Sequence, residues 1–519
     1  MTGVMKNSVV KIVIALIIAM MVFAYMPMMG LKVHAEDKVI GKLNDTSYTS
    51  FEQLRNDLEN NYENKSVTIE MLTDWQDSDE DITKETTLID WSYKGKQYDF
   101  PLYIPEGCNA TLNMNGHVFD RRIDKKKEGG YNPDTDTGVC ISMHSNSKIT
   151  INGGDNSKEH RVGIFTGYDY QKDYSNDTKQ YTNYSGAVLS GAYRGIYMNK
   201  GSQVVVNDVS IVGCGLANSR PGGGIFMEKG STLEMNNSSI EYCATEDDGG
   251  AIFTTRDGNN KIVLNNTAIT NNWAGSEGGG IDIDGENTQI IGDGNSSVSQ
   301  NHAKSHGGGI YAWNDEQTVK GLIIEGNETE KNGGGICTVE EDVLLENLIV
   351  KNNKASKNGG GIYIENDVNT LNNCEVRENT ASGLGNGVYV EADVDEDFWL
   401  KGKTIIEDNN GSNLYIGDTD CDDTEVEFEL SEGSEIWIAY HDGNHDKVKV
   451  SYHSGDYSKY LHSDQDGYYF TYQDGKTLRL RGNPNTASVF GGGNAVILII
   501  AAAAILIVAM GAIKLSKKR

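Results

Sequence analysis

Short apolar runs alternate with polar residues along most of this chain, and glycine, asparagine or aspartate bounds most of the runs. Examples are residues 204–206, 233–235, 262–264 and 322–324. A period of two over short runs with such boundaries predicts half-buried β-strands. Long stretches with apolar residues three and four positions apart, which helical repeats would need, are missing. The pattern therefore predicts an all-β protein built from many short strands.

A glycine-rich phrase, most often GGGI or GGAI, recurs along the chain and ends in one aliphatic anchor residue. The anchors follow one another at intervals of 26 to 29 residues: Ile196, Ile225, Ile252, Ile281, Ile310, Ile336, Ile362 and Val388. A period of this length indicates one supersecondary unit stacked on copies of itself. With about three short strands per period, we expect a parallel β-helix in which each repeat is one coil and the anchors form one interior column.

An asparagine and an alanine precede the glycines at a constant spacing. The pairs are Asn272 and Ala274, Asn301 and Ala303, Asn353 and Ala355, and Asn379 and Ala381, with Asn327 and Thr329 as a variant. Asparagine tolerates left-handed backbone, and its carboxamide can bond the equivalent residue of the next coil. We therefore expect structural corner residues here, rather than glycosylation or ligand sites.

The stack is expected to begin with a helix that covers its open strand edges. The residues from Thr49 to Glu52 form a capping box, and Phe51, Leu54 and Leu58 follow at helical spacing. The predicted organisation is a signal peptide at 1–35, an N-terminal cap at 36–65, a β-helix at 66–410, irregular final coils with a C-terminal cap at 411–482, and an anchor region at 483–519.

Both ends of the chain carry targeting patterns. Lys6 and Lys11, an apolar run and a small-residue approach to Ala35 predict a secretory signal peptide. Residues 495–513 carry no charge and are long enough to span a bilayer, and a basic tail follows them, so we expect a C-terminal transmembrane helix. The region between the two segments is therefore expected outside the cell.

A short motif stands before the apolar segment: Asn483, Pro484, Asn485, Thr486 and Ala487. The order of motif, apolar segment and basic tail resembles a Gram-positive cell-wall sorting signal. The motif is similar to the LPxTG substrates of sortases and differs from them at its first and last residues. The resemblance implies that a sortase cysteine attacks the Thr486 carbonyl and leaves the protein amide-linked to peptidoglycan. A plain transmembrane anchor is the alternative.

The glycine repeats carry a second resemblance, over residues 45–480. The arrangement is similar to the right-handed parallel β-helix, or pectin-lyase-like, superfamily. The GGGI and GGAI phrases resemble the repeats of chlamydial polymorphic outer-membrane proteins and of gut-bacterial adhesin-like proteins. The resemblance implies a right-handed parallel β-helix. It specifies fold more than activity, because the glycine phrases are the parts that make corners.

Charge and cysteine content restrict the expected partners. The net charge of −30 repels nucleic acid, anionic lipid and bare polyuronate. The seven cysteines are an odd number without metal-ligand spacing, so we expect buried hydrophobic residues rather than a disulfide framework or a zinc site. Cys214 and Cys243 stand one period apart, and a disulfide between them is the alternative.

The residue after each anchor is expected to point outward, and most of these residues are aromatic. Together with a tryptophan on the same face, the candidates for stacking on sugar rings are Tyr197, Phe226, Phe253, Tyr311, Trp313, Tyr363 and Tyr389. Aromatic rings beside carboxylates suit a long neutral glycan. Packing of stacked rings within the β-helix would explain the same pattern.

Three carboxylates are the candidates for catalysis. The sequence as a whole favours a non-catalytic function over an enzyme that uses them. Asp282 and Asp284 alternate on one strand, and Glu228 is expected two coils away from Asp284, whereas glycoside hydrolysis requires a pair of carboxylates on one face. No ordered motif like that of polygalacturonases is present. No cofactor is required.

One acidic run offers ligands for a metal ion. The alternating residues Asp418, Asp420 and Asp422 would suit calcium, although the twelve-residue loop with a terminal glutamate is missing. A solvated acidic loop is the more common origin of such a run.

The expected function is a non-catalytic β-helical protein, displayed outside a Gram-positive cell and anchored to its wall or membrane. Its adhesive or glycan-binding face would meet a glycan or the surface of a host or neighbouring cell. Sortase, peptidoglycan and the membrane are the other expected partners, and nucleic acid is not one. A cell-bound polysaccharide hydrolase or lyase that uses Asp282 and Asp284 is the alternative, and a spacer without a ligand is the third.

Overall fold

The computed structural model describes residues 38–76, 101–121, 139–165, 179–215, 221–366, 369–391, 397–417, 425–439, 456–464, 467–473 and 477–482. The chain divides into two units, Met1–Val39 and Ile40–Arg519, and all the described helices and strands belong to the second. The predicted signal peptide, sortase motif and transmembrane segment lie outside the described residues. Within the described ranges, no helix is long and apolar enough to cross a membrane.

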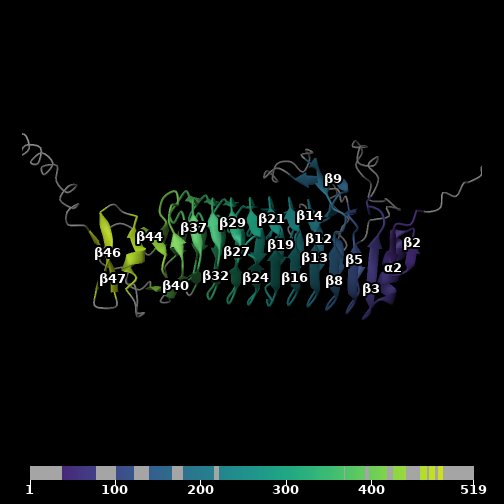
Figure 1. Cartoon of the computed structure of the whole chain (residues 1–519), viewed down its shortest axis with the longest axis horizontal. Coiled ribbons are helices and arrows are strands. Elements are labelled where there is room, and N and C mark those ends of the chain that lie inside the picture. Colours follow the sequence, from purple (N-terminus) through teal and green to yellow (C-terminus); the bar gives the residue numbers. More distant parts are fainter. Residues whose placement is uncertain are drawn as a thin grey trace, which may run out of the picture. The chain divides into compact units, whose positions relative to one another are not determined.

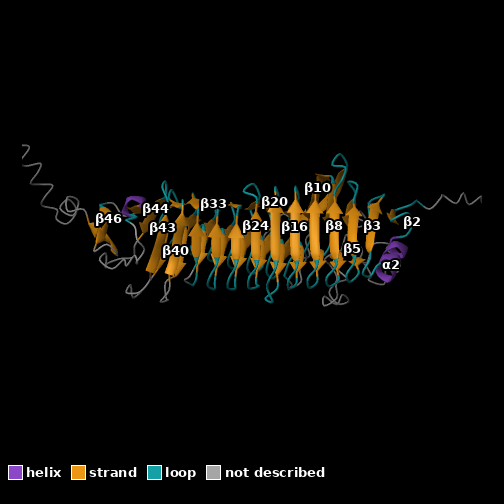
Figure 2. Ribbon diagram, turned by 60° about the horizontal axis from the view of Figure 1, so that its bottom comes forward, coloured by secondary structure: helices purple, strands orange, loops and turns teal. Residues whose placement is uncertain are grey.

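Parallel strands stack coil upon coil into a β-solenoid, as predicted (Figures 1 and 2). One side is a 14-stranded sheet, which we call the long sheet. In spatial order it contains β2 (Thr46–Tyr48), β1 (Gly41–Leu43), β3 (Ser66–Met71), β5 (Asn109–Asn113), β8 (Lys148–Asn152), β13 (Gln203–Asn207), β16 (Thr232–Asn236), β20 (Lys261–Asn265), β24 (Gln289–Gly292), β28 (Thr318–Lys320), β32 (Leu344–Glu346), β36 (Thr370–Asn372), β40 (Asp397–Gly402) and β43 (Glu425–Leu430).

A 23-stranded sheet consists of two parallel ladders. The anchor ladder contains β4 (Leu102–Ile104), β7 (Val139–Met143), β12 (Arg194–Met198), β15 (Ile225–Met227), β19 (Ile252–Thr254), β23 (Ile281–Ile283), β27 (Ile310–Ala312), β31 (Ile336–Thr338), β35 (Ile362–Ile364), β39 (Val388–Glu391) and β42 (Leu414–Gly417). The side ladder contains β6 (Val118–Asp120), β11 (Ala187–Ser190), β14 (Val209–Val212), β17 (Ser239–Glu241), β21 (Ala268–Thr270), β25 (Ser297–Ser299), β29 (Ile323–Glu325), β33 (Ile349–Lys351), β37 (Glu375–Arg377), β41 (Ile405–Ile406), β44 (Glu435–Ala439) and β45 (Leu461–Ser463).

Smaller elements complete the described fold. A 6-stranded corner sheet contains β18 (Ala244–Thr245), β22 (Trp273–Ala274), β26 (His302–Ala303), β30 (Glu328–Thr329), β34 (Lys354–Ala355) and β38 (Thr380–Ala381). The other elements are the antiparallel hairpins β9 (Glu159–Phe165) with β10 (Lys179–Ser185) and β46 (Tyr468–Gln473) with β47 (Thr477–Gly482), the helix α2 (Phe51–Asn61) and the 3₁₀ turn η2 (Ser458–Tyr460).

The anchor residues form a single interior column, as predicted. Ile225 pairs in parallel register with Ile252, and the same pairing continues through Ile281 and Ile310 to Val388. Each of these side chains is fully buried in one continuous apolar core. The parallel stack is therefore held by aliphatic side chains of neighbouring coils, while the hand of the coil stays a prediction.

The corner asparagines form an internal hydrogen-bonded file, also as predicted. The side-chain amide of Asn272 donates to the carbonyl oxygen of Ile240 at 3.0 Å and to Oδ1 of Asn301 at 2.9 Å. Asn301 bonds Asn327 in the same way, and the file continues through Asn353. Because each side chain bonds main-chain groups and the next copy, these buried polar residues are satisfied within the stack.

The glycine phrase allows two coils to approach closely at the corner. Gly307 has a φ of +64°, in the left-handed region that favours glycine. At Gly308, an added Cβ would lie 2.4 Å from the carbonyl oxygen of Gly334 in the next coil. The first glycine thus supplies a turn, and the second leaves room for the neighbouring main chain.

Helix α2 lies at the N-terminal end of the stack, where the sequence predicted a cap (Figure 2). The side chain of Ser50 accepts a hydrogen bond from the backbone N–H of Gln53, and Phe51, Leu54 and Leu58 are buried. The ring of Phe51 lies 4.9 Å from that of Trp75, which closes the core at this end. The predicted helix is therefore confirmed.

The final coils remain parallel after the glycine phrase ends. β40 pairs with β43, and β44 pairs with β45. The hairpin of β46 and β47 then follows in the chain. The six cysteines that fall in the described ranges are buried and free, as expected of small hydrophobic residues.

Candidate functional site

The residues that follow the anchors form a regular outer file. Tyr197 pairs in register with Phe226, and Asp282 lies between Phe253 and Tyr311 in the same file. The rings of Tyr197 and Phe226 stack at 5.1 Å with an interplanar angle of 5°. Further along, Tyr363 stacks on Tyr389, and Tyr389 on Tyr415. Many ring faces in this file are therefore occupied by neighbouring rings.

Much of this outer file is covered. Phe253, Tyr311 and Tyr363 are buried, and Tyr311 and Tyr363 form an apolar cluster with Cys337 that is separate from the main core. Trp313 and Tyr389 pack against this cluster and are partly buried. The glycine corners produce the cover, because each one folds back over the residue after the anchor. A sugar chain at this file would meet ring edges and the half-buried members of the file.

Five carboxylates gather beside β19 and β23, and we call them the acidic corner: Asp247, Asp248, Glu277, Asp282 and Asp284. The Asp248 carboxylate accepts the Glu277 backbone N–H at 3.1 Å, and the two side chains are hydrogen-bonded. Burial and this bond raise the pKa of Asp248 to about 7. Although burial opposes it, hydrogen bonds from Ser276, Asp248 and Ser305 lower the pKa of Glu277. Asp248 therefore holds the proton of this pair.

Asp282 lies at the centre of the acidic corner and is only 1% exposed. Its burial, together with the neighbouring Asp248, Asp284 and Glu277, raises its pKa well above the usual range. Oδ1 of Asp282 has no hydrogen-bond partner among the described residues. Burial in this position thus favours the protonated form of the Asp282 carboxyl.

The other two catalytic candidates have separate partners. Asp284 accepts a hydrogen bond from Nε of Arg256 at 3.2 Å, and the guanidinium of Arg256 lies 4.9 Å from the centre of the Trp313 ring. Glu228 accepts a hydrogen bond from the hydroxyl of Tyr197. Asp282 and Asp284 thus lie near each other, whereas Glu228 is engaged with the aromatic file.

The shared proton predicts a pH-dependent stability. The folded-state pKa of Asp248 is about 7, against about 3.8 in an unfolded chain, so its contribution is present below pH 4 and is lost as the pH rises toward 7. When the pH is raised from 5 to 8, the free energy of unfolding of the unaltered chain should fall by about 2 kcal/mol more than that of Asp248→Asn. Urea titrations at both pH values measure this. Asp257→Asn, an exposed site with the same charge change, is the control; equal pH dependence in both variants would contradict the expectation.

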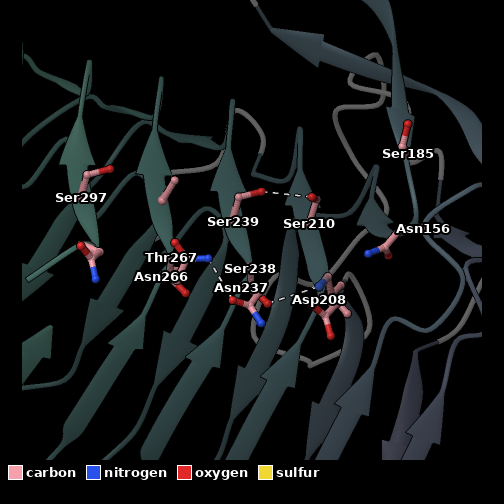
Figure 3. A pocket seen from close by; sticks show the side chains of 13 residues that line it. Asn156, Ser185, Asp208, Ser210, Asn237, Ser238, Ser239, Asn266, Thr267 and Ser297 are labelled. Atoms are coloured by element: carbon pink, nitrogen blue, oxygen red, sulfur yellow. Dashed lines mark hydrogen bonds between the residues drawn. The ribbon is translucent and has the colours of Figure 1, made fainter. Parts of the chain in front are cut away.

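A polar pocket lies on a different side of the solenoid, where the side ladder meets the turns from the long sheet (Figure 3). We call this pocket, of about 360 Å³, the serine groove. It is lined by Asn156, Ser185, Asp208, Val209, Ser210, Asn237, Ser238, Ser239, Asn266, Thr267, Ala268, Asn295 and Ser297. Ser210, Ser239 and Ser297 stand on the first, second and fourth of four successive strands of the side ladder, and Ser185 stands on the hairpin beyond them.

Small side chains make the groove hollow. Ser210, Ser239, Ala268 and Ser297 occupy one register row of the side ladder, and the next position in that row is Ile323. The hydroxyl of Ser239 donates to that of Ser210 at 3.1 Å, so these neighbours form a continuous polar floor. The larger isoleucine ends the row of small residues. The groove is thus a short stretch of small side chains in a row whose other outward side chains, such as Ile323, are larger.

The hairpin of β9 and β10 bounds the groove at its other end. Val162 and Ile164 of this hairpin pack on Val188 and Val212, two outward residues of the side ladder. The hydroxyl of Tyr184 donates to the carboxylate of Glu241 at 3.0 Å. These contacts cover Val188 of β11 and Val212 of β14, so the open part of the row begins at Ser210.

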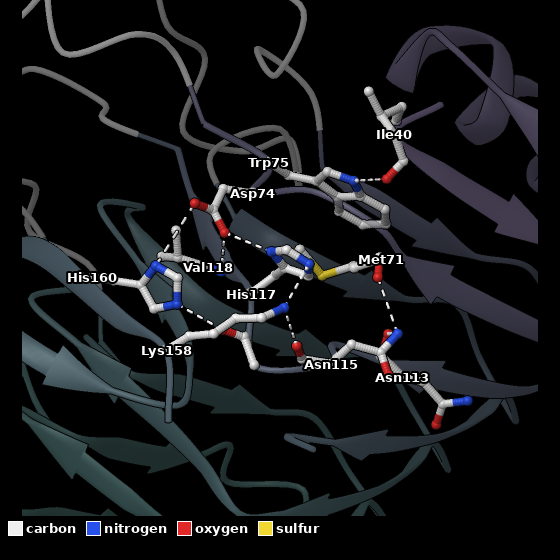
Figure 4. A network of polar contacts seen from close by, with 11 residues as sticks. Ile40, Met71, Asp74, Trp75, Asn113, Asn115, His117, Val118, Lys158 and His160 are labelled. Atoms are coloured by element: carbon white, nitrogen blue, oxygen red, sulfur yellow. Dashed lines mark hydrogen bonds and ion pairs between the residues drawn. The ribbon is translucent and has the colours of Figure 1, made fainter. Parts of the chain in front are cut away.

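A polar network fixes the start of the hairpin (Figure 4). Nζ of Lys158 lies 3.0 Å from Nε2 of His117, and Nδ1 of His117 lies 2.8 Å from Oδ1 of Asp74. Because an ammonium group only donates, Nε2 accepts and Nδ1 carries the proton that bonds Asp74. His160 bonds the carbonyl oxygen of Gly116 at 2.6 Å and faces Asp74. The network holds the segment that carries Asn156 against the early coils.

The predicted aromatic and acidic residues lie near one another, and the serine groove is the part that the sequence did not reveal. In the sequence, its serines and asparagines do not differ from other polar surface residues. One feature of the sequence accompanies the groove. The interval between anchor residues shortens along the chain, and the strands of the long sheet shorten with it, from five residues in β20 to three in β28. The groove lies on the coils with the longer strands.

The calcium candidates Asp418, Asp420 and Asp422 lie outside the described residues. Within the part of the chain that the structure describes, no group of histidine, cysteine, aspartate or glutamate has the arrangement of a metal site. The calcium hypothesis stays a prediction.

One segment of the chain is similar to a known protein family. Residues 347–365 match the model of the Chlamydia polymorphic membrane protein repeat. This segment contains one asparagine corner and one glycine phrase, from β33 to β35. Comparisons with curated proteins and with solved structures found no match. The chain is therefore a parallel β-solenoid with one segment similar to this repeat.

Proposed function

We propose that the chain is a non-catalytic protein of the cell surface, and that its solenoid presents a binding face to a glycan or to the surface of another cell. The observation that carries this proposal is the contrast between the two candidate sites. The serine groove is an open polar pocket, whereas Asp282, at the centre of the acidic corner, is buried. The match to a membrane-protein repeat supports display at a surface.

The anchoring is part of the proposal. Residues 483–487 followed by an apolar segment and a basic tail support attachment by sortase to a Gram-positive wall, at Thr486. The leader at 1–35 supports export. The strongly negative charge supports a partner other than nucleic acid.

Adhesion assays test the proposed function. Cells that produce the full chain should carry it on their outside, accessible to added protease, and should attach to glycan-coated or cell-coated surfaces several-fold more than cells without it. A chain found only inside the cell, or display without any gain in attachment, would refute the proposal.

A polysaccharide hydrolase or lyase is the second candidate, because in the acidic corner the protonated Asp248 lies beside the Glu277 carboxylate, whose pKa is lowered. The unaltered chain should release no sugars from neutral or acidic polysaccharides. Sugar release that disappears in Asp282→Asn and Asp284→Asn would instead establish the enzyme.

A further inference from the structure

The serine groove offers groups that both donate and accept hydrogen bonds. Hydroxyls such as those of Ser185 and Ser297 and carboxamides such as those of Asn156 and Asn237 line it. A sugar ring presents the same two-way chemistry through its own hydroxyls. An apolar ligand would strip water from these groups without replacing their hydrogen bonds, which is unfavourable. The lining therefore favours a polyhydroxylated ligand.

Charge narrows the ligand class further. Asp208 is the one ionisable residue among those that line the serine groove. Among the described residues that line the groove, no ammonium or guanidinium group compensates an acidic sugar or a phosphate, and the net charge of −30 repels both. A cationic polymer would find only one carboxylate in the groove with which to form an ion pair. The ligand that fits is uncharged.

Equivalent lining residues recur in the groove along the direction in which the coils stack. Its floor is the row from Ser210 to Ser297, with one residue from each coil. The turn residues Asp208, Asn237 and Asn266, all with positive φ, form a second row beside the floor. Because neighbouring coils lie about 4.8 Å apart, a linear polymer with one unit per coil meets equivalent groups at each step.

We propose that the serine groove binds a neutral glycan chain that runs across successive coils, from the hairpin of β9 and β10 toward Ile323. This proposal rests on the proposed function of the chain as a surface binding protein. The serines and asparagines bond the sugar hydroxyls, and the methyl group of Ala268 contacts the carbon face of a ring. The hairpin and Ile323 set the two ends of the bound segment.

The test compares two tryptophan variants of the full chain. Ala268→Trp fills the middle of the groove floor. Ile349→Trp is the matched control, because Ile349 lies in the same register row one coil past Ile323 and is 38% exposed. Binding to dextran, mannan and laminarin is measured, with polygalacturonate as the acidic comparison. Melting temperatures of both variants report whether the fold is kept.

At least one neutral polysaccharide should bind, and Ala268→Trp should weaken that binding by about tenfold or more because the ring occupies the ligand volume. Ile349→Trp should change it by less than about twofold. Ser239→Ala removes a hydroxyl without filling the groove and should weaken binding by about threefold to tenfold, the effect of one neutral hydrogen bond.

Unchanged binding in Ala268→Trp would overturn the assignment, as would polygalacturonate binding at least as strongly as the neutral polymers. Absence of binding to every neutral polysaccharide would also overturn it. If cells with Ala268→Trp still attach as well as cells with the unaltered chain, the surface function stands and the groove assignment fails. If cells with the unaltered chain do not display it, or do not attach, the proposed function itself is rejected.

Discussion

Replacing Asn327 with alanine should lower the free energy of unfolding by about 4 kcal/mol, because it interrupts the buried asparagine file. Asn327 is fully buried, and its Oδ1 accepts hydrogen bonds from the backbone and the side chain of Asn301, each at 3.0 Å. Its Nδ2 donates to the carbonyl oxygen of Val298 at 2.9 Å. Alanine leaves the backbone N–H of Asn301 and the carbonyl of Val298 buried without these partners, at about 1–3 kcal/mol each.

Urea unfolding followed by circular dichroism measures this loss. Asn265→Ala is the matched control, since Asn265 is half-buried on the outer end of β20 and donates one side-chain bond to Asn236 at 2.8 Å. The control should lose less than about 1 kcal/mol because water replaces the missing partner. Equal losses in the two variants would show that the internal file contributes no more than a surface amide row.

Gly308→Ala should destabilise the fold by about 3 kcal/mol or more, through overpacking of main chain against main chain. The added methyl carbon would lie 2.4 Å from the carbonyl oxygen of Gly334 and 2.6 Å from that of Glu328. Both atoms belong to the next coil and cannot rotate away as a side chain would. The coils must separate at this corner, which weakens the bond from the Gly308 N–H to the Gly333 oxygen at 2.9 Å.

Gly294→Ala separates this clash from the conformational preference of glycine. Gly294 has a φ of +83°, and nothing lies within 4 Å of an added methyl there, so strain alone should cost about 1–2 kcal/mol. Urea midpoints of the two variants give the comparison. A Gly308→Ala chain as stable as the Gly294→Ala chain would mean that the second glycine of the phrase is not required for close approach.

The sequence predicted those parts of the fold that local spacing determines. The anchor column follows from the repeat interval, since each glycine phrase returns the chain to the same corner before an aliphatic residue such as Ile281. The asparagine file follows from a constant offset to that corner. Helix α2 follows from the capping box at residues 49–52 and the spacing of Phe51, Leu54 and Leu58, and the structure places the N-cap at Ser50. In each case, the signal lies within one coil or one helix.

The parts of the candidate sites that were not predicted depend on how separate coils meet. Asp282 points away from the main core, as expected, but the corner at Gly278 lies so close that an added Cβ there would be 2.7 Å from the Cβ of Asp282. That approach buries the carboxyl, and spacing along one strand does not reveal it. The serine groove requires the register of four coils and the position of an inserted hairpin, because Ser210, Ser239 and Ser297 are far apart in the sequence.

The change in strand length along the long sheet has a consequence for how this protein can diversify. The coils from β28 to β36 have three-residue strands, and the first of them carries Ile323, where the groove floor ends, so none of them contributes to the floor. Whole coils of this shorter type can be duplicated or deleted with the anchor and asparagine positions kept in phase. The length of the solenoid and the proposed binding groove therefore lie in separate stretches of the sequence, so a change in the number of short coils leaves the groove residues unaltered.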